Sequence, residues 1–126
     1  MEIKEKIEIL INESKTVNKF SHLNVIFRLN DIRDSVNQYK RLVKSEKKYQ
    51  IDYKDIIFNR TLRRREIEDD IIRDIVFLDK FAKNNNFEML YGKFTDIELK
   101  YTDFALENNY KRKDILECSL EISKVI

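Results

Sequence analysis

The stretch NVIFRLNDIRDSVNQYKRLVKSEKKY, residues 24–49, decides the fold. Its apolar side chains recur at alternating spacings of four and three residues, at Val25, Leu29, Ile32, Val36, Tyr39 and Val43. This spacing places all of them on one stripe of a helix. The intervening positions are mostly charged or amide side chains, so the opposite face is expected to lie in water. The stretch therefore predicts a long helix, running to about Lys48, that must bury one face against other helices.

A second apolar stripe supplies a helix of similar length for the first one to pack against. Its members are Ile67, Ile71, Ile75, Leu78 and Ala82. Asp52 is a suitable N-cap for this helix, and the run 84–86, which is Asn-Asn-Asn, is a suitable end, because Asn tolerates the left-handed conformation that terminates helices. We therefore expect a second long helix over about residues 53–83, packed face to face with the first.

Shorter helices are predicted on both sides of this pair. Residues 2–17 carry a helical stripe, followed by a break over 18–24 in which Ser21 or Asn24 caps the next helix. Thr95 and Glu98 match a capping box, so a helix is expected over 96–107, after a single turn within 87–91. A last helix from about Lys111 is expected to turn four side chains toward the core: Ile115, Cys118, Ile122 and Val125.

Composition supports an all-α fold of one domain. The chain has 126 residues, no proline and one glycine, Gly92, whereas sheets need Gly and Pro at frequent turns. Apolar residues make up 42% of the chain and charged residues 38%, which is typical of helices with strongly charged outer faces. We expect a compact bundle of about five helices over residues 1–126, which the long helix could also join into a homodimer.

The same composition argues against several classes of protein. Cys118 is the sole cysteine, so neither an internal disulfide nor a cysteine zinc site can form. The N-terminal residues carry a charge every two or three positions, unlike a signal peptide, and no apolar run approaches the ~20 residues that cross a bilayer. These features predict a cytoplasmic protein with no membrane association.

Charge is concentrated in the middle of the chain. Residues 40–65 contain ten Lys or Arg and three Asp or Glu, although the formal net charge of the whole chain is only +2. The candidate contacts to a partner protein or a nucleic acid are Lys40, Arg41, Lys44, Lys47, Lys48, Arg60, Arg63, Arg64 and Arg65. Lys and Arg can neutralise phosphates, and the tyrosines among them could stack on unpaired bases.

Two of these arginines raise a particular question. If the helix is continuous, the inner stripe traced back from Ile67 meets Arg64 and then Arg60, and an inward arginine is costly unless it is paired. Either the helix breaks between residues 60 and 66, or the arginines bind an acidic group, such as Asp31, Asp34 or a ligand phosphate. The simpler alternative is that Arg64 and Arg65 form surface pairs with Glu68 and Asp69.

The sequence predicts no catalytic site, no metal site and no cofactor site. His22 is the single histidine and has no neighbouring acid cluster, and Cys118 is expected to act as a small buried apolar residue. Glu66, Asp70 and Asp74 are expected to form an acidic face in solvent. Residues 96–126 resemble a helix–turn–helix only in outline, with Lys111 to Lys113 at the start of its second helix.

These observations favour a small non-enzymatic regulatory or adaptor protein that acts by binding another protein. Its partner could be a second copy of itself. The alternative is a regulator that binds nucleic acid through the basic segment Lys40–Arg65, with no cofactor in either case.

Overall fold

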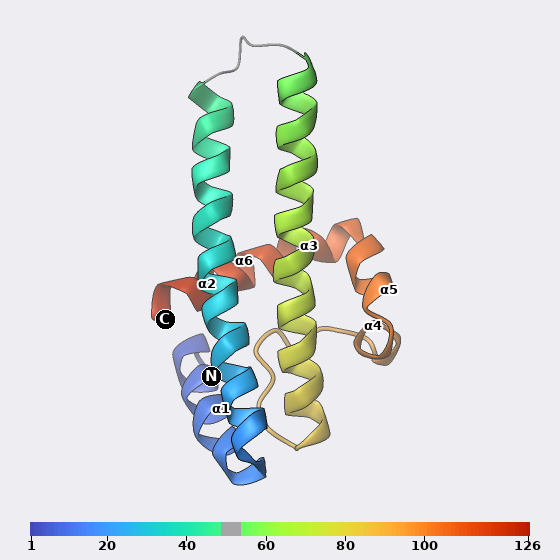
Figure 1. The fold of residues 1–126 in the computed structure, drawn as a ribbon. Helices are drawn as coiled ribbons and strands as arrows, with labels where there is room; N and C mark the ends of the chain where they lie inside the picture. The colour runs from blue at the N-terminus through green and yellow to red at the C-terminus, as the bar shows by residue number, and fades with distance from the viewer. Residues whose placement is uncertain (49–53) are drawn as a thin grey trace.

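The chain folds as an all-α bundle built on two long antiparallel helices, as the apolar stripes predict (Figure 1). The computed structural model describes the backbone of residues 1–48 and 54–126 and the side chains of residues 1–45 and 62–126. Within these residues there are six helices: α1 (Ile3–Val17), α2 (Lys19–Lys48), α3 (Lys54–Asn84), α4 (Asp96–Lys100), α5 (Thr102–Glu107) and α6 (Asn109–Val125).

The two stripes form the centre of the core. In α2, the side chains of Val25, Leu29, Ile32 and Val36 are buried, and all five members of the α3 stripe are buried as well. Tyr39 is half-buried at the end of the α2 stripe. The predicted packing of α2 against α3 is therefore confirmed, and the heptad positions of α2 are covered within the chain itself.

The remaining helices cover one end and one side of the α2–α3 pair. Figure 1 shows α1 running back along the first half of α2, while α6 crosses the pair and α4 and α5 lie beside α3. Ile7 and Leu10 of α1 and Ile115 and Ile122 of α6 are buried in the shared core. The second half of α2 and the first half of α3 extend beyond these helices as a hairpin.

The break between α1 and α2 is shorter than predicted. Only Asn18 leaves the helical conformation, with φ −173° and ψ 170°, and its side-chain Oδ1 accepts a hydrogen bond from Ser21 N at 2.7 Å. Asn18 is thus the N-cap of α2, and the prediction of Ser21 or Asn24 was wrong. His22, in the first turn of α2, lies 3.0 Å from Ser14 Oγ and holds the two helices together at this corner.

The helix ends near Asn84 and Thr95 follow the predicted chemistry. Asn86 adopts φ 59°, and Phe87 N donates to Ala82 O at 2.8 Å, so a left-handed Asn terminates α3. Thr95 and Glu98 form the predicted capping box. The helix that this box begins is interrupted at Tyr101 and continues as α5, so the single helix predicted over 96–107 is two, and residues 87–91 form no helical turn.

Candidate functional site

The described part of the basic segment lies on the second half of α2 and the first half of α3. α3 is continuous from Lys54 to Asn84, which excludes the alternative of a break near residues 60–66. The described candidates are Lys40, Arg41, Lys44, Arg63, Arg64 and Arg65, and all are exposed or half-buried. The side chains of Lys47, Lys48 and Arg60 lie outside the described residues.

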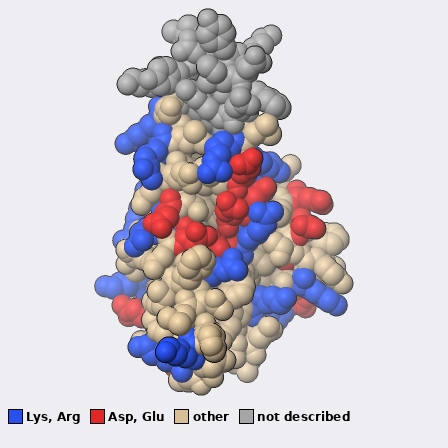
Figure 2. All heavy atoms as spheres, in the orientation of Figure 1, with Lys and Arg blue, Asp and Glu red and all other residues tan. Residues whose placement is uncertain are grey.

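Acidic neighbours accompany several of these cations. Arg63 Nη1 lies 3.1 Å from Glu66 Oε2, and Arg64 Nε lies 3.9 Å from Glu68 Oε2. The simpler alternative for Arg64, a pair with Glu68 one turn away, is therefore confirmed. On the face shown in Figure 2, basic and acidic side chains alternate along the hairpin, which differs from the continuous positive surface of a typical phosphate-binding groove.

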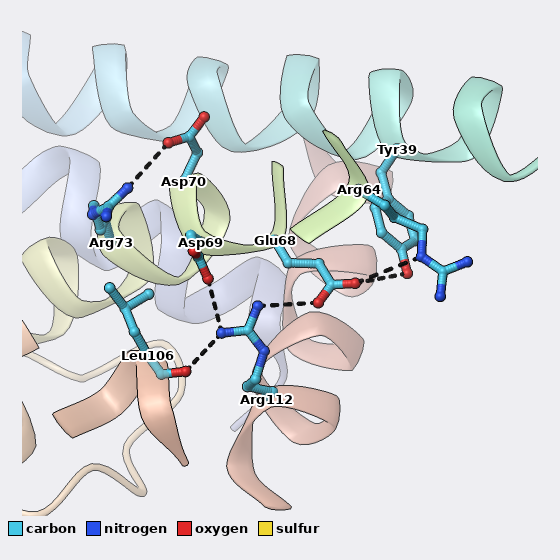
Figure 3. Close-up of polar contacts among 8 residues, drawn as sticks. All are labelled: Tyr39, Arg64, Glu68, Asp69, Asp70, Arg73, Leu106 and Arg112. Atoms are coloured by element: carbon cyan, nitrogen blue, oxygen red, sulfur yellow. Dashed lines mark hydrogen bonds and ion pairs between the residues drawn. The ribbon is translucent and has the colours of Figure 1, made fainter. Parts of the chain in front are cut away.

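The predicted pair of Arg65 with Asp69 is replaced by a longer-range contact. Asp69 instead pairs with Arg112 of α6, whose Nη1 lies 2.8 Å from Asp69 Oδ1 (Figure 3). The same guanidinium reaches Glu68 Oε1 at 3.1 Å and donates to the Leu106 carbonyl at 2.7 Å. Tyr39 of α2 donates to the other Glu68 oxygen at 3.2 Å. Arg112 thus joins α3, α5 and α6, and Glu68 extends the network to α2.

The helix–turn–helix likeness, which held only in outline, would need Arg112 exposed at the start of α6, and the structure buries it. Its side chain is only 6% exposed, because the inner stripe of α6 consists of Arg112, Ile115, Ser119 and Ile122. Lys111 is also engaged, through an ion pair with Glu98. Burial opposes ionisation of Glu98, but hydrogen bonds from Lys111 and Thr95 outweigh it and keep the pKa of Glu98 below its usual value. Two of the three cations at the start of α6 therefore hold the fold together.

A second buried charge lies between α2 and α3. Asp74 is 2% exposed, and Arg28 Nη1 donates to its Oδ1 at 2.8 Å. Burial and the adjacent Asp31 carboxyl raise the pKa of Asp74 to about 7. The prediction that Asp74 shares a solvated acidic face with Glu66 and Asp70 was therefore wrong for Asp74. Asp31 and Asp34, suggested as partners of Arg60 or Arg64, lie beside Asp74 and Arg33, and the side chain of Arg60 lies outside the described residues.

Asp79 is a third buried carboxylate, which sequence reasoning did not single out. It accepts hydrogen bonds from three consecutive backbone amides: Leu90 at 2.7 Å, Tyr91 at 3.2 Å and Gly92 at 2.8 Å. Burial raises its pKa, although these three amides oppose the shift. Asp79 therefore fixes the segment between α3 and α4 on the side of α3.

An apolar groove lies where α6 crosses the α2–α3 pair, and its mainly apolar lining makes it a candidate site for binding. It has a volume of about 460 Å³. Its apolar walls are formed by Val36, Tyr39, Ile71, Leu116 and Leu120. Arg65 and Lys113 stand at its edge and are exposed, with Glu117 nearby, while the paired Glu68 and Arg112 also line it. A groove of this composition suits a partly apolar segment with a few charged groups.

The remaining candidates for chemistry are structural. Cys118 is half-buried, and burial raises the pKa of its thiol to about 12, so it is poorly suited to act as a nucleophile. No group of three or more His, Cys, Asp or Glu side chains in the described part of the chain is arranged to hold a metal ion. The described chain is thus a helical bundle with an apolar groove on its surface.

Comparisons with known proteins add no assignment to this class. No protein-family model matches the chain, and searches of curated proteins and of solved structures return no match. None of the helices in the described residues combines the length and the apolar character needed to cross a membrane.

Proposed function

We propose that this protein is a small non-enzymatic adaptor or regulator that binds another protein through the groove between α2, α3 and α6. The observation that carries the proposal is the chemistry of the groove: apolar side chains from three helices line it, and two exposed cations stand at its edge. The occupant that fits is an amphipathic helix of the partner, which would lay its apolar face against Leu116 and Leu120.

Charge complementarity selects among such helices. The two acidic side chains within the Arg112 network are already paired, so they do not repel an acidic partner. Arg65 and Lys113 are exposed and stand at the same groove. A partner helix with carboxylates beside its apolar stripe would therefore bind more tightly than one with lysines there, and rim charges of this kind mainly increase the association rate.

The alternative function, nucleic-acid binding through Lys40–Arg65, rests on the exposed cations Lys40 and Lys44 of α2. The carboxylates of Glu66 and Glu68 weaken this alternative, because they already pair with Arg63 and Arg64 and would compete with phosphates for these arginines. It nevertheless makes a separate prediction: binding of single-stranded or duplex oligonucleotides that falls steeply with salt and depends on Lys40 and Lys44.

The test compares two substitutions on α6, of which only one lies in the groove. Leu120 and Val125 are both 37% exposed, but only Leu120 lines the groove. Leu120→Asp and Val125→Asp should therefore perturb folding equally, whereas only Leu120→Asp should remove a groove-bound partner. Tagged wild type and both variants are used to capture proteins from lysate of the source cells with and without nuclease treatment, and candidates are checked by reciprocal capture.

A helical peptide from each verified partner is then titrated against the wild type and against Arg65→Glu and Lys113→Glu. We expect at least tenfold weaker binding of an acidic peptide by each variant. The proposal fails if no captured protein distinguishes Leu120→Asp from Val125→Asp. If the captured material instead disappears with nuclease, the nucleic-acid alternative takes its place.

A further inference from the structure

An unusual apolar stripe lies on the outer face of α2. Phe20 is 79% exposed, Leu23 53% and Phe27 64%, and their spacings of three and four residues place them on one side of the helix. This side is opposite the core stripe that contains Val25 and Leu29, since each member lies roughly half a turn away from a core position. α2 is therefore apolar on two faces in its first half, and only the inner face is covered.

The charges at the two ends of this outer stripe have opposite signs. Lys19 begins α2, next to Lys15 at the end of α1, and both are exposed. Beyond Phe27 come Asp31 and then Asp34, whose side chain is 67% exposed. Figure 2 shows the same order on this face: an area over the first half of α2 that is largely uncharged, with acidic side chains above it and basic ones below.

We propose that this face pairs with the same face of a second copy of the chain, in an antiparallel arrangement about a two-fold axis. A two-fold interface must be complementary to itself, because each half contacts the other half of an identical surface. An apolar centre with a positive end and a negative end satisfies this condition when the two helices run in opposite directions.

The sequence fixes the register of this pairing. Lys19 and Asp31 are twelve residues apart, or about 18 Å along the helix, and the midpoint between them is residue 25. An axis at that level brings Lys19 opposite Asp31 of the second copy, with Asp34 one turn further on. It also brings Leu23 opposite Phe27 of the second copy. The charge contacts at the two ends of the interface and the apolar contact at its centre therefore form in the same register.

The area available limits the strength of the dimer. The uncovered stripe spans two turns of one helix, which is smaller than a standard interface between proteins. The dimer is therefore weak and forms with increasing concentration. It is independent of the proposed function, because the groove borders α6 and the inner residues Val36 and Tyr39, whereas the stripe faces away from the core.

The test measures self-association of the full chain by sedimentation velocity over a wide concentration range. The wild type should shift from monomer toward dimer, and Phe27→Asp should weaken association at least tenfold. Phe104→Asp is the matched control, because Phe104 is similarly exposed, at 55%, but lies on α5. Circular dichroism verifies that each variant remains folded.

A charge exchange tests the antiparallel register. Lys19→Glu alone places like charges opposite Asp31 and Asp34, and Asp34→Lys alone places like charges opposite Lys19, so each variant should self-associate at least threefold more weakly than the wild type. An equimolar mixture of the two should form a heterodimer that is more stable than either homodimer. One end of its interface regains Lys19 opposite Asp31 and Asp34, and at the other end the introduced glutamate gains the introduced lysine as a partner. Asp34 is chosen over Asp31 because Asp31 also lies beside the buried Asp74.

Three outcomes would overturn the proposal: a wild type that stays monomeric at its highest soluble concentration, equal effects of Phe27→Asp and Phe104→Asp, or a mixture that associates no better than its components. If the wild type stays monomeric while Leu120→Asp still removes a partner, the dimer fails and the groove function stands. If dimers form while the groove variants change nothing, the reverse holds.

Discussion

The guanidinium group of Arg112 and the carboxylate of Glu68 meet at 3.1 Å, although the two residues are 44 positions apart in the chain. This contact links α6 to α3 through one charged side chain. Arg112 is the cationic partner of two carboxylates and also donates to a backbone carbonyl. Glu68 and Asp69 are mostly shielded from water, so the negative charge of each carboxylate would be less compensated if Arg112 were removed.

We expect Arg112→Leu to lower the free energy of unfolding by about 3 kcal/mol, because breaking a buried ion pair leaves uncompensated charges. Arg73→Leu is the control: it breaks an exposed pair with Asp70 and should cost no more than ~0.5 kcal/mol. Urea denaturation followed by circular dichroism measures both. Equal losses in the two variants would show that the network around Arg112 adds nothing beyond a surface pair.

Asp74 should make stability decrease with rising pH. Its folded pKa of about 7 lies above its ordinary value of 3.8, so the folded state holds this proton more tightly than the unfolded state. The associated stability is fully present below pH 3.8 and is lost as the pH rises to about 7. Asp74→Asn cannot ionise, and its amide can still accept from Arg28 and donate to Asp31.

The difference in unfolding free energy between Asp74→Asn and wild type should therefore grow in favour of the variant across this range, by on the order of 3 kcal/mol, and then level off. Denaturant titrations at a series of pH values measure it, with Asp70→Asn as the exposed control. A difference that is independent of pH would mean that Asp74 titrates normally.

Asp79 should be less tolerant of truncation than of amide replacement. Asp79→Ala leaves the backbone amides of Leu90, Tyr91 and Gly92 without their acceptor, and each unsatisfied buried donor costs about 1–3 kcal/mol. We expect a loss of about 3 kcal/mol for Asp79→Ala and roughly half of that for Asp79→Asn, which keeps one acceptor oxygen. Thermal unfolding ranks the variants, and the opposite order would contradict this account.

Substitutions of Gly92 separate the cost of backbone strain from the cost of side-chain packing. Its φ of +76° is unfavourable for residues with a side chain, while an added Cβ would approach no atom closer than 4.0 Å, at Met89 Cβ. Gly92→Ala should therefore cost about 1 kcal/mol from conformation alone, and Gly92→Asn less, because Asn tolerates positive φ better. Chemical denaturation distinguishes the two. A loss for Asn equal to or larger than that for Ala would argue that sterics dominate.

The long helices were predictable because their core positions are apolar and strictly spaced. The miss at Asp74 has a geometric cause. Side chains four residues apart are rotated by about 40° on a helix with 3.6 residues per turn. Glu66, Asp70 and Asp74 therefore turn progressively toward the inner stripe, by about 80° in all, and Asp74 reaches the contact with α2.

The misses on α6 arose because only apolar side chains were counted as candidates for the core. The true inner stripe includes Arg112 and Ser119, at the correct spacing from Ile115 and Ile122. Arg112 is stable there because α3 supplies two carboxylates. This compensation depends on tertiary packing, and no sequence pattern near residue 112 predicts it. The groove and the exposed outer stripe of α2 likewise required the packing before they could be recognised.

The three amides held by Asp79 belong to a segment without regular secondary structure, yet their protons are tied to the buried side of α3, near its C-terminal end. Such protons cannot reach solvent by fraying of a loop, so they should exchange with deuterium as slowly as those of α3 itself. The exchange rates of the amides of residues 90–92 would then report opening of the whole bundle, whereas those of an ordinary connecting segment report only local motion of that segment.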